Sequence, residues 1–174
     1  MALLQDGVTG ELTEGQKEVA QILHQNTLVL QSEIEALLRF NAAAFEARQL
    51  RVEVSGERTT LQLDPEKIAS AVGNLLSNAI RFSPEQGTVR LAVSRASGAV
   101  LIDVSDQGPG VAPADKAHVF EPFFRGERQP ENAVRGTGIG LSIVQEYIHA
   151  HGGRVHLLGE APHSFFRIEL PDAS

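Results

Sequence analysis

Four short segments carry the residue types that could do chemistry, and they follow one another in order along the chain. They read NLLSNAIRF at 74–82, DQGPG at 106–110, FEPFFRG at 120–126 and GTGIGL at 136–141. Each is weakly diagnostic alone, because GTGIG differs from the GxGxxG dinucleotide fingerprint and no Walker-type GxxxxGK(S/T) string occurs. Together they offer side-chain amides for a metal, an acid among glycines for a base and glycine amides for phosphate oxygens. The combination predicts one ATP site.

Asn74 and Asn78 lie four residues apart in a helix expected over 65–82, so their side chains share one face. Asn is a poor helix former, which favours a use for both amides over the alternative of solvated surface groups. An amide oxygen suits Mg²⁺, which takes few protein ligands beside waters and phosphate oxygens. Asn78 is therefore the candidate metal ligand. Arg81, three residues further on, could contact a phosphate or be an exposed cation at the helix end.

Asp106 ends an expected strand and enters a glycine turn. Gly108 and Gly110 let the backbone turn sharply and come close to a flat ring. The carboxylate can accept the exocyclic amine of adenine, whereas it would repel the carbonyl that guanine has at the same place. Asp106 is therefore the candidate adenine-recognising residue, with a plain Asp-Gly turn as the alternative.

Three further glycines, Gly136, Gly138 and Gly140, precede a helix expected over 139–150. Free backbone amides and the positive end of the helix dipole would meet an anion there, which predicts contact with phosphate. The alternative is a glycine turn that only lets the helix approach the sheet.

Three phenylalanines are expected to pack in the core and to anchor the near edge of a polar lid over 125–136. They are Phe120, Phe123 and Phe124. Arginines at the start of the lid and within it are candidates for neutralising a terminal phosphate. They are Arg125, Arg128 and Arg135, with surface charge as the alternative for the last two.

The chain has 174 residues with 22 acidic against 15 basic ones, a net charge of −7. This excess of negative charge argues against binding to nucleic acid or to a membrane surface. The lack of cysteine excludes disulfides and thiolate metal sites. No apolar run approaches the roughly 18 residues of a membrane span, and no signal peptide is expected. The histidines at 149, 151 and 156 lack a completing carboxylate pattern, so no metal is expected on them.

Apolar and small residues recur at alternating spacings of three and four across 14–49 and predict one long helix. Thr13 and Gln16 fit a capping box at its start. Such a helix needs a partner. We favour a second helix in an intermolecular bundle, and the alternative is that the helix packs on its own globular domain.

Beyond residue 50 the pattern changes to the alternation of strands. Strands are expected at 50–54, 60–63, 88–93, 99–106, 153–158 and 163–170. Helices are expected at 65–82, near 114–119 and at 139–150, the first of them starting at Pro65 after Asp64. The predicted fold class is an α+β two-layer sandwich with helices on one face of the sheet, preceded by one long N-terminal helix.

The four segments resemble the N, G1, F and G2 boxes of the catalytic ATP-binding domain of sensor histidine kinases, which has the Bergerat ATP-binding fold. The resemblance covers nearly the whole chain. Residues 50–174 are similar to the catalytic domain, and residues 1–49 to the end of the dimerisation and phosphoacceptor hairpin, with its loop and second helix. The resemblance implies that Asn78 holds Mg²⁺, that Asn74 lies beside phosphate and that Asp106 reads adenine.

The full set of site residues that this resemblance implies falls into two groups. The expected catalytic residues are Asn74, Arg81 and Arg125. The expected nucleotide-binding residues are Asn74, Asn78, Arg81, Phe82, Asp106, Gly108, Gly110, Phe120, Gly136, Thr137, Gly138, Ile139, Gly140 and Leu141.

The chain departs from the family pattern in four places. The H-box with its phosphoacceptor histidine is absent and is expected upstream of residue 1. Arg81 and Phe82 stand where the family often has Lys and Tyr, which keeps the charge and the ring but loses a hydroxyl. The link between Leu50 and Asp64 is short. APHSFF at 161–166 replaces the usual glycine-rich approach to the last strand, a change expected to lie outside the site.

The resemblance implies the kinase portion of a two-component sensor histidine kinase that binds Mg²⁺ and ATP. It would transfer the γ-phosphate to a histidine outside this chain, for relay to the aspartate of a response-regulator receiver domain, and would not phosphorylate itself. The intact protein is expected to be a homodimer anchored in the bacterial inner membrane, with this portion in the cytoplasm. Two alternatives remain: a serine kinase of the anti-sigma-factor type, and a non-catalytic dimerisation or interaction module.

Overall fold

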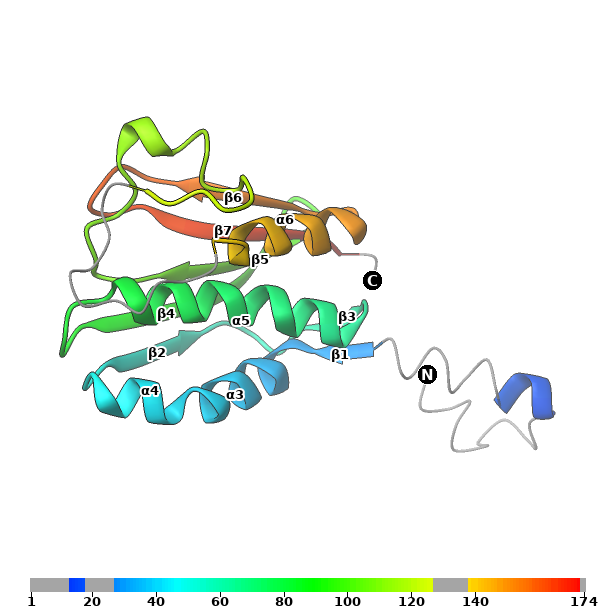
Figure 1. Cartoon of the computed structure of the whole chain (residues 1–174). Coiled ribbons are helices and arrows are strands. Elements are labelled where there is room, and N and C mark those ends of the chain that lie inside the picture. Colours follow the sequence, from blue (N-terminus) through cyan, green and yellow to red (C-terminus); the bar gives the residue numbers. More distant parts are fainter. Residues whose placement is uncertain (1–12, 18–26, 127–137, 173–174) are drawn as a thin grey trace.

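The computed structural model describes residues 13–17, 27–126 and 138–172. Five strands form its main sheet in the order β2-β4-β5-β7-β6 (Figure 1). Their bounds are Arg51–Ser55 for β2, Thr88–Ala96 for β4, Ala99–Ser105 for β5, Phe165–Pro171 for β7 and Arg154–Leu158 for β6. β2 runs parallel to β4, and the remaining neighbours are antiparallel.

Alternating side chains make one face of this sheet apolar. In β5, Val100, Ile102 and Val104 are buried, while the residues between them are only partly covered. The antiparallel register sets buried residues of β7 opposite them, namely Leu170, Ile168 and Phe166. This apolar face is the floor of the hydrophobic core.

Two helices, α5 (Pro65–Phe82) and α6 (Gly140–Ala150), lie side by side over that face (Figure 1). The helix α5 starts where the sequence predicts, because the Asp64 side chain accepts hydrogen bonds from the amides of Glu66 and Lys67 and Pro65 takes the first position. One stripe of α5 is buried, from Ile68 to Ile80. Each large side chain buried in this way stabilises the fold by about 1.5–3 kcal/mol.

The N-terminal part differs from the expected single helix over 14–49. Residues 14–17 are helical, and the predicted capping box is confirmed, because Thr13 and Gln16 exchange backbone-to-side-chain hydrogen bonds of 3.0 and 3.2 Å. Thr27–Val29, however, is a strand, β1, which pairs antiparallel with β3 (Thr60–Gln62). Two shorter helices follow, α3 (Leu30–Phe40) and α4 (Ala42–Ala47), and the break between them falls at Asn41.

The apolar stripe of this segment is buried against the chain's own domain, so the alternative of self-packing describes residues 27–47. Leu30, Ile34 and Phe45 belong to the same core as the sheet and α5. The helix α3 comes close to α5 because Gly73 has no side chain, and a Cβ there would lie 3.3 Å from Cδ2 of Leu37. Within residues 27–47 the buried apolar residues therefore face the chain's own domain, and α3 packs against α5.

Two smaller differences concern the predicted elements of the domain. β3 pairs with β1 in a separate two-stranded sheet and does not join the main one. The short helix expected near 114–119 is a 3₁₀ turn, Pro113–Asp115. The two-layer α+β sandwich itself is confirmed, with N-terminal helices present (Figure 1).

Candidate functional site

A cleft opens between the end of α5, the start of α6 and the segment 106–126. Its first part encloses about 890 Å³ counted out to its open mouth. Its second part encloses about 810 Å³ on the same measure. Six residues line both parts: Asn78, Arg81, Val119, Phe124, Gly138 and Leu141. The two parts are therefore one continuous cleft.

The cleft has two chemically different ends. Asp106, Gly110 and Ser164 line one part only, which we call the Asp106 end. Asn74, Ser77 and Gly140 line the other part only, which we call the Asn74 end. Asn78 and Arg81 line both and so stand where the ends meet.

The helix α5 presents its polar residues to the cleft because its apolar stripe faces the core. Asn74 and Asn78 lie one turn apart, and Leu75, Leu76 and Ala79 beside them are buried. This arrangement follows directly from the helical period. The predicted sharing of one face by the two amides is therefore seen in the structure.

Arg81 is the main cation on the wall of the cleft. Its Nη2 donates to Oδ1 of Asn78 at 3.2 Å, and its guanidinium lies over the ring of Phe82 at 5.1 Å. Its Nε is buried and has no hydrogen-bond partner within the described part of the chain. Burial lowers the pKa of Arg81, and the nearby charge of Arg125 lowers it further. Two neighbouring cations and an unused buried donor are the marks of an anion site.

Asp106 follows the last residue of β5 and turns its carboxylate into the cleft. Its Oδ1 accepts a 2.7 Å hydrogen bond from the amide of Gly108. Burial raises the pKa of Asp106, and the hydrogen bond from Gly108 opposes part of that rise. Gly108 is required here because a Cβ would collide with the carbonyl oxygen of Phe82 and would lie 2.6 Å from Oδ1 of Asp106.

Ser164 lies at the Asp106 end, which corrects the expectation that APHSFF is outside the site. Its hydroxyl oxygen accepts a 3.0 Å hydrogen bond from the amide of Val111, and only 9% of the residue is exposed. A Cβ on Gly110 would lie 2.7 Å from the same oxygen. The signal was present in the strand register: β5 and β7 pair Val104 with Phe166, and two more residues bring position 164 opposite position 106.

The third segment divides between the core and the cleft. Phe120 packs its ring edge-on against Phe166, with centroids 6.0 Å apart, and is absent from both linings of the cleft. Phe124 and Arg125 line the cleft, as expected of a segment at its rim. Asp115, which we did not predict, also lines it and is buried, and nothing in its sequence context marks it.

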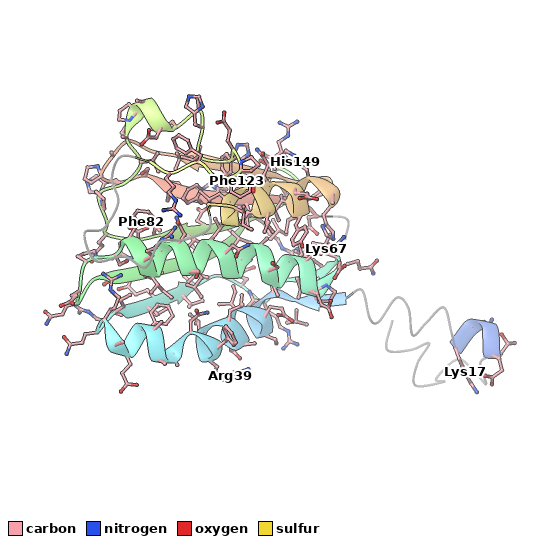
Figure 2. The ribbon with its side chains drawn as sticks, in the orientation of Figure 1. Lys17, Arg39, Lys67, Phe82, Phe123 and His149 are labelled. Atoms are coloured by element: carbon pink, nitrogen blue, oxygen red, sulfur yellow. The ribbon has the colours of Figure 1, made fainter. Side chains whose placement is uncertain are left out.

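The third and fourth segments are joined at the base of the expected lid. The amide of Phe123 donates to the carbonyl oxygen of Gly138 at 2.8 Å, and Gly138 has a positive φ of 76°. A Cβ on Gly138 would lie 2.8 Å from Cα of Phe123, so glycine is required at this crossing. Figure 2 shows Phe123 near the start of α6; the residue is 75% exposed, so the expectation that it packs in the core is wrong.

The start of α6 faces Asn74. Ile139 is the N-cap residue, Gly140 opens the helix, and a Cβ on Gly140 would lie 3.9 Å from Cγ of Asn74. Gly140 and Leu141 line the cleft, whereas Ile139 does not. The predicted site residues Gly136 and Thr137 lie outside the described residues, and so do the lid arginines at 128 and 135.

Two of the three histidines considered above, His151 and His156, make structural contacts. His151 receives the amide of Asp64 on Nε2 at 3.3 Å and contacts the carbonyl oxygen of Tyr147 through Nδ1 at 2.7 Å. His156 pairs with Glu169 at 3.1 Å. Among the residues that the structure describes, no three His, Cys, Asp or Glu side chains are grouped to hold a metal ion.

Comparison with known proteins places this geometry in a family. The family model of histidine kinase-, DNA gyrase B- and HSP90-like ATPases matches residues 63–174. The sensor histidine kinase GlrK of Escherichia coli (strain K12) is 34% identical over 198 aligned positions, which cover 98% of this chain and 42% of GlrK. The chain therefore spans less than half the length of this relative. Because 198 positions exceed the 174 residues of the chain, GlrK also has residues in that stretch that the chain lacks.

Two solved structures show the same fold. The mycobacterial sensor histidine kinase MprB superposes with a TM-score of 0.72 at 28% identity, over 83% of this chain and 97% of that one. The histidine kinase ThkA, solved in complex with the response regulator protein TrrA, superposes with a TM-score of 0.69 at 22% identity, over 84% of this chain and 41% of that one.

Within the described residues, no helix has the length and apolar character needed to cross a bilayer. The matched residues include the Asn74, Asp106 and Gly138 segments that build the cleft. The chain thus belongs to the histidine kinase-, DNA gyrase B- and HSP90-like ATPases, and contains the ATPase domain of a sensor histidine kinase.

Proposed function

We propose that the cleft binds ATP together with Mg²⁺ and that the domain transfers the γ-phosphate to a histidine of the parent kinase outside these 174 residues. One observation carries the proposal: Asp106, Asn78 and the arginine pair Arg81 and Arg125 line the same cleft. An acceptor for a base amine thus lies in one cavity with cations for phosphate and an oxygen ligand for a metal.

The Asp106 end accounts for the choice of base. The carboxylate would accept a hydrogen bond from the exocyclic amine of adenine. The Gly108 amide fixes the carboxylate by donating to its Oδ1 at 2.7 Å. Guanine would place a carbonyl oxygen against the same carboxylate. The two oxygens would repel each other without a hydrogen bond between them, in a partly desolvated site. The apolar residues around it, Val111 and Ala112, supply the flat contacts that a purine ring needs.

The Asn74 end accounts for the phosphates. Asn78 would hold Mg²⁺ through its amide oxygen, and the chemistry of a neutral hard oxygen fits that ion. When bound, Mg²⁺ neutralises charge on the phosphate oxygens. Arg81 adds a cation where the two ends meet, Arg125 adds a second one in the Asp106 part, and Asn74 lies one turn from Asn78 on the same face of α5. Catalysis here is positioning and charge neutralisation, because the attacking group is the imidazole of the substrate histidine.

In the parent protein, we propose that the dimerisation and phosphoacceptor hairpin ends upstream of β1, and that the catalytic domain begins at β1 and not at residue 50, because residues 27–47 pack into its core. The intact kinase would be a homodimer anchored in the bacterial inner membrane, with this domain in the cytoplasm. A response-regulator receiver domain would accept the phosphoryl group, which is consistent with the complex of ThkA and TrrA.

Isothermal titration calorimetry of the purified chain tests nucleotide binding. We expect heat on addition of ATP with Mg²⁺, weaker binding with EDTA in place of Mg²⁺, and little binding of GTP. A chain that gives no heat with millimolar ATP would instead be a non-catalytic interaction module.

Incubation with γ-labelled ATP tests the place of the phosphoacceptor. We expect no acid-labile phosphohistidine on the purified chain alone. Label that appears on the chain itself would refute a phosphoacceptor outside it, and alkali-labile phosphoserine on an added partner would favour the serine-kinase alternative.

A further inference from the structure

The C-terminal end of α5 is held by a residue from the N-terminal segment. Arg48 follows α4 directly and points its guanidinium at the last turn of α5. Its Nη1 donates to the carbonyl oxygens of Ile80 and Arg81, the latter at 3.0 Å, and its Nη2 donates to the carbonyl oxygen of Ser83. The last carbonyls of a helix lack partners within the helix, and a planar guanidinium with several donors can bind a group of them at once.

The backbone around Arg48 reinforces this attachment. The amide of Gln86 donates to the carbonyl oxygen of Arg48 at 3.1 Å, and the amide of Arg51 donates to the carbonyl oxygen of Gly87 at 2.9 Å. Residues 48–51 and 83–87 are thus bound to each other on both sides of the guanidinium. Ser83, at the centre, is only 1% exposed.

The turn that Arg48 holds is also part of the cleft. Arg81 and Phe82 belong to this turn, and both line the Asp106 end. The carbonyl oxygen of Phe82 lies against Gly108, the residue whose amide fixes the Asp106 carboxylate. A shift of the turn would therefore move a cleft cation and disturb the support of the base-recognising acid.

We propose that Arg48 is a positioning residue of the nucleotide site, through which the N-terminal segment 27–49 is coupled to the cleft. It is absent from both linings of the cleft and acts only by fixing the last turn of α5. The inference rests on the proposed binding of ATP. Since coupling between sites is reciprocal, nucleotide in the cleft should in turn strengthen the attachment of residues 48–51.

A purely structural helix cap would look the same in the coordinates, so the test needs a matched control. Asp64 caps the opposite end of α5, accepts two backbone hydrogen bonds there and is absent from both linings of the cleft. Figure 2 shows Lys67, in the first turn, at the other end of α5 from Phe82. Asp64→Ala therefore weakens the same helix far from the cleft.

We expect Arg48→Gln to weaken binding of ATP with Mg²⁺ about fivefold or more, within the usual range of coupling between sites. Asp64→Ala should lower the thermal midpoint comparably and leave the affinity within about twofold. Arg48→Lys, which keeps the charge but not the planar fork, should lie between Arg48→Gln and the wild type. Equal affinities for Arg48→Gln and Asp64→Ala at similar thermal midpoints would overturn the proposal.

Hydrogen exchange on the wild-type chain provides a second test that needs no variant. We expect ATP with Mg²⁺ to slow amide exchange at 48–51 and 83–87 as well as in the cleft. Protection confined to the cleft would refute the coupling even if Arg48→Gln does not fold.

A wild-type chain that binds no ATP would refute the proposed function instead. In that case faster exchange at 106–110 in Arg48→Lys than in Asp64→Ala would still support the positioning role, and equal rates would overturn it.

Discussion

The two ends of the cleft are built in different ways. At the Asp106 end the polar groups are already engaged, since the Asp106 carboxylate accepts from Gly108 and the Ser164 hydroxyl accepts from Val111. Where the ends meet, burial and the nearby charge of Arg125 lower the pKa of Arg81, and a buried Arg81 nitrogen lacks a partner in the described part. The Asp106 end is preorganised for a ligand, whereas the region around Arg81 is completed by one.

This difference predicts opposite effects of substitution on binding and on stability. Removing the Ser164 hydroxyl should cost both affinity and stability, because the amide of Val111 loses its acceptor. Removing the desolvated cation Arg81 should cost affinity for a ligand with phosphates while leaving the free protein at least as stable. The following experiments test that contrast.

The largest expected effect is a loss of affinity for ATP when the residue that recognises the base is changed. Asp106→Asn should weaken binding of ATP on the order of 100-fold, because a hydrogen bond to a charged acceptor is lost and an amide group faces the adenine amine. Calorimetric titration measures it, with Glu35→Gln on the exposed side of α3 as a charge-matched control. An affinity for ATP that equals that of the control would remove Asp106 from the site.

Arg81→Gln should weaken binding of ATP about tenfold and leave binding of adenosine unchanged, because adenosine lacks phosphate. The thermal midpoint of the free protein should stay the same or rise, since a desolvated cation beside Arg125 is removed. Arg39→Gln, at the exposed end of α3 (Figure 2), removes the same charge as a control. A parallel loss of adenosine affinity would mean that Arg81 supports the base and not the phosphates.

Ser164→Ala should weaken binding of ATP only a few fold and lower the free energy of unfolding by about 1 kcal/mol, because the amide of Val111 loses its acceptor in a buried place. Ser164→Thr keeps the hydroxyl and should retain most of the affinity. The two variants compared by titration and thermal unfolding separate the hydroxyl from the volume of the side chain. If both behave like the wild type, the preorganisation of this end does not depend on Ser164.

The smallest expected effect is the pH dependence of the free protein. The pKa of Asp106 is raised in the fold, so its contribution to stability is fully present below the ordinary carboxyl pKa and is lost as pH rises through the folded value. Asp106→Asn should therefore be slightly more stable than the wild type at neutral pH, by less than about 1 kcal/mol. The gain should disappear as pH falls to about 4. Thermal unfolding of both proteins across this range checks the sign, and a wild type that is the more stable one at pH 7 would contradict it.

The sheet and α5 could be predicted from the sequence because their signals are local. Alternation marks β5, and Asp64 with Pro65 marks the start of α5. The segment 27–49 could not be resolved in this way, since the same apolar period serves a helix against a second chain or against its own domain. The three residues of β1 are also too short to interrupt that period visibly.

The site residues also divide into those marked by a local sequence pattern and those placed by contacts between distant residues. Asn78, Arg81 and Asp106 could be identified because each lies in a segment with its own pattern, and all three line the cleft. Ser164 was missed because its place depends on the pairing of β5 with β7, which is a contact between distant residues. Phe120 carries the right residue type but is turned into the core against Phe166.

The close approach of Leu37 to Gly73 has a practical consequence for the preparation of a minimal ATPase domain. A shortened chain that begins at residue 50 would lack the core residues Leu30, Ile34 and Phe45. The apolar surface of α5 that they cover would then be exposed to water. Such a chain should aggregate, whereas one that begins before β1 should stay monodisperse in size-exclusion chromatography.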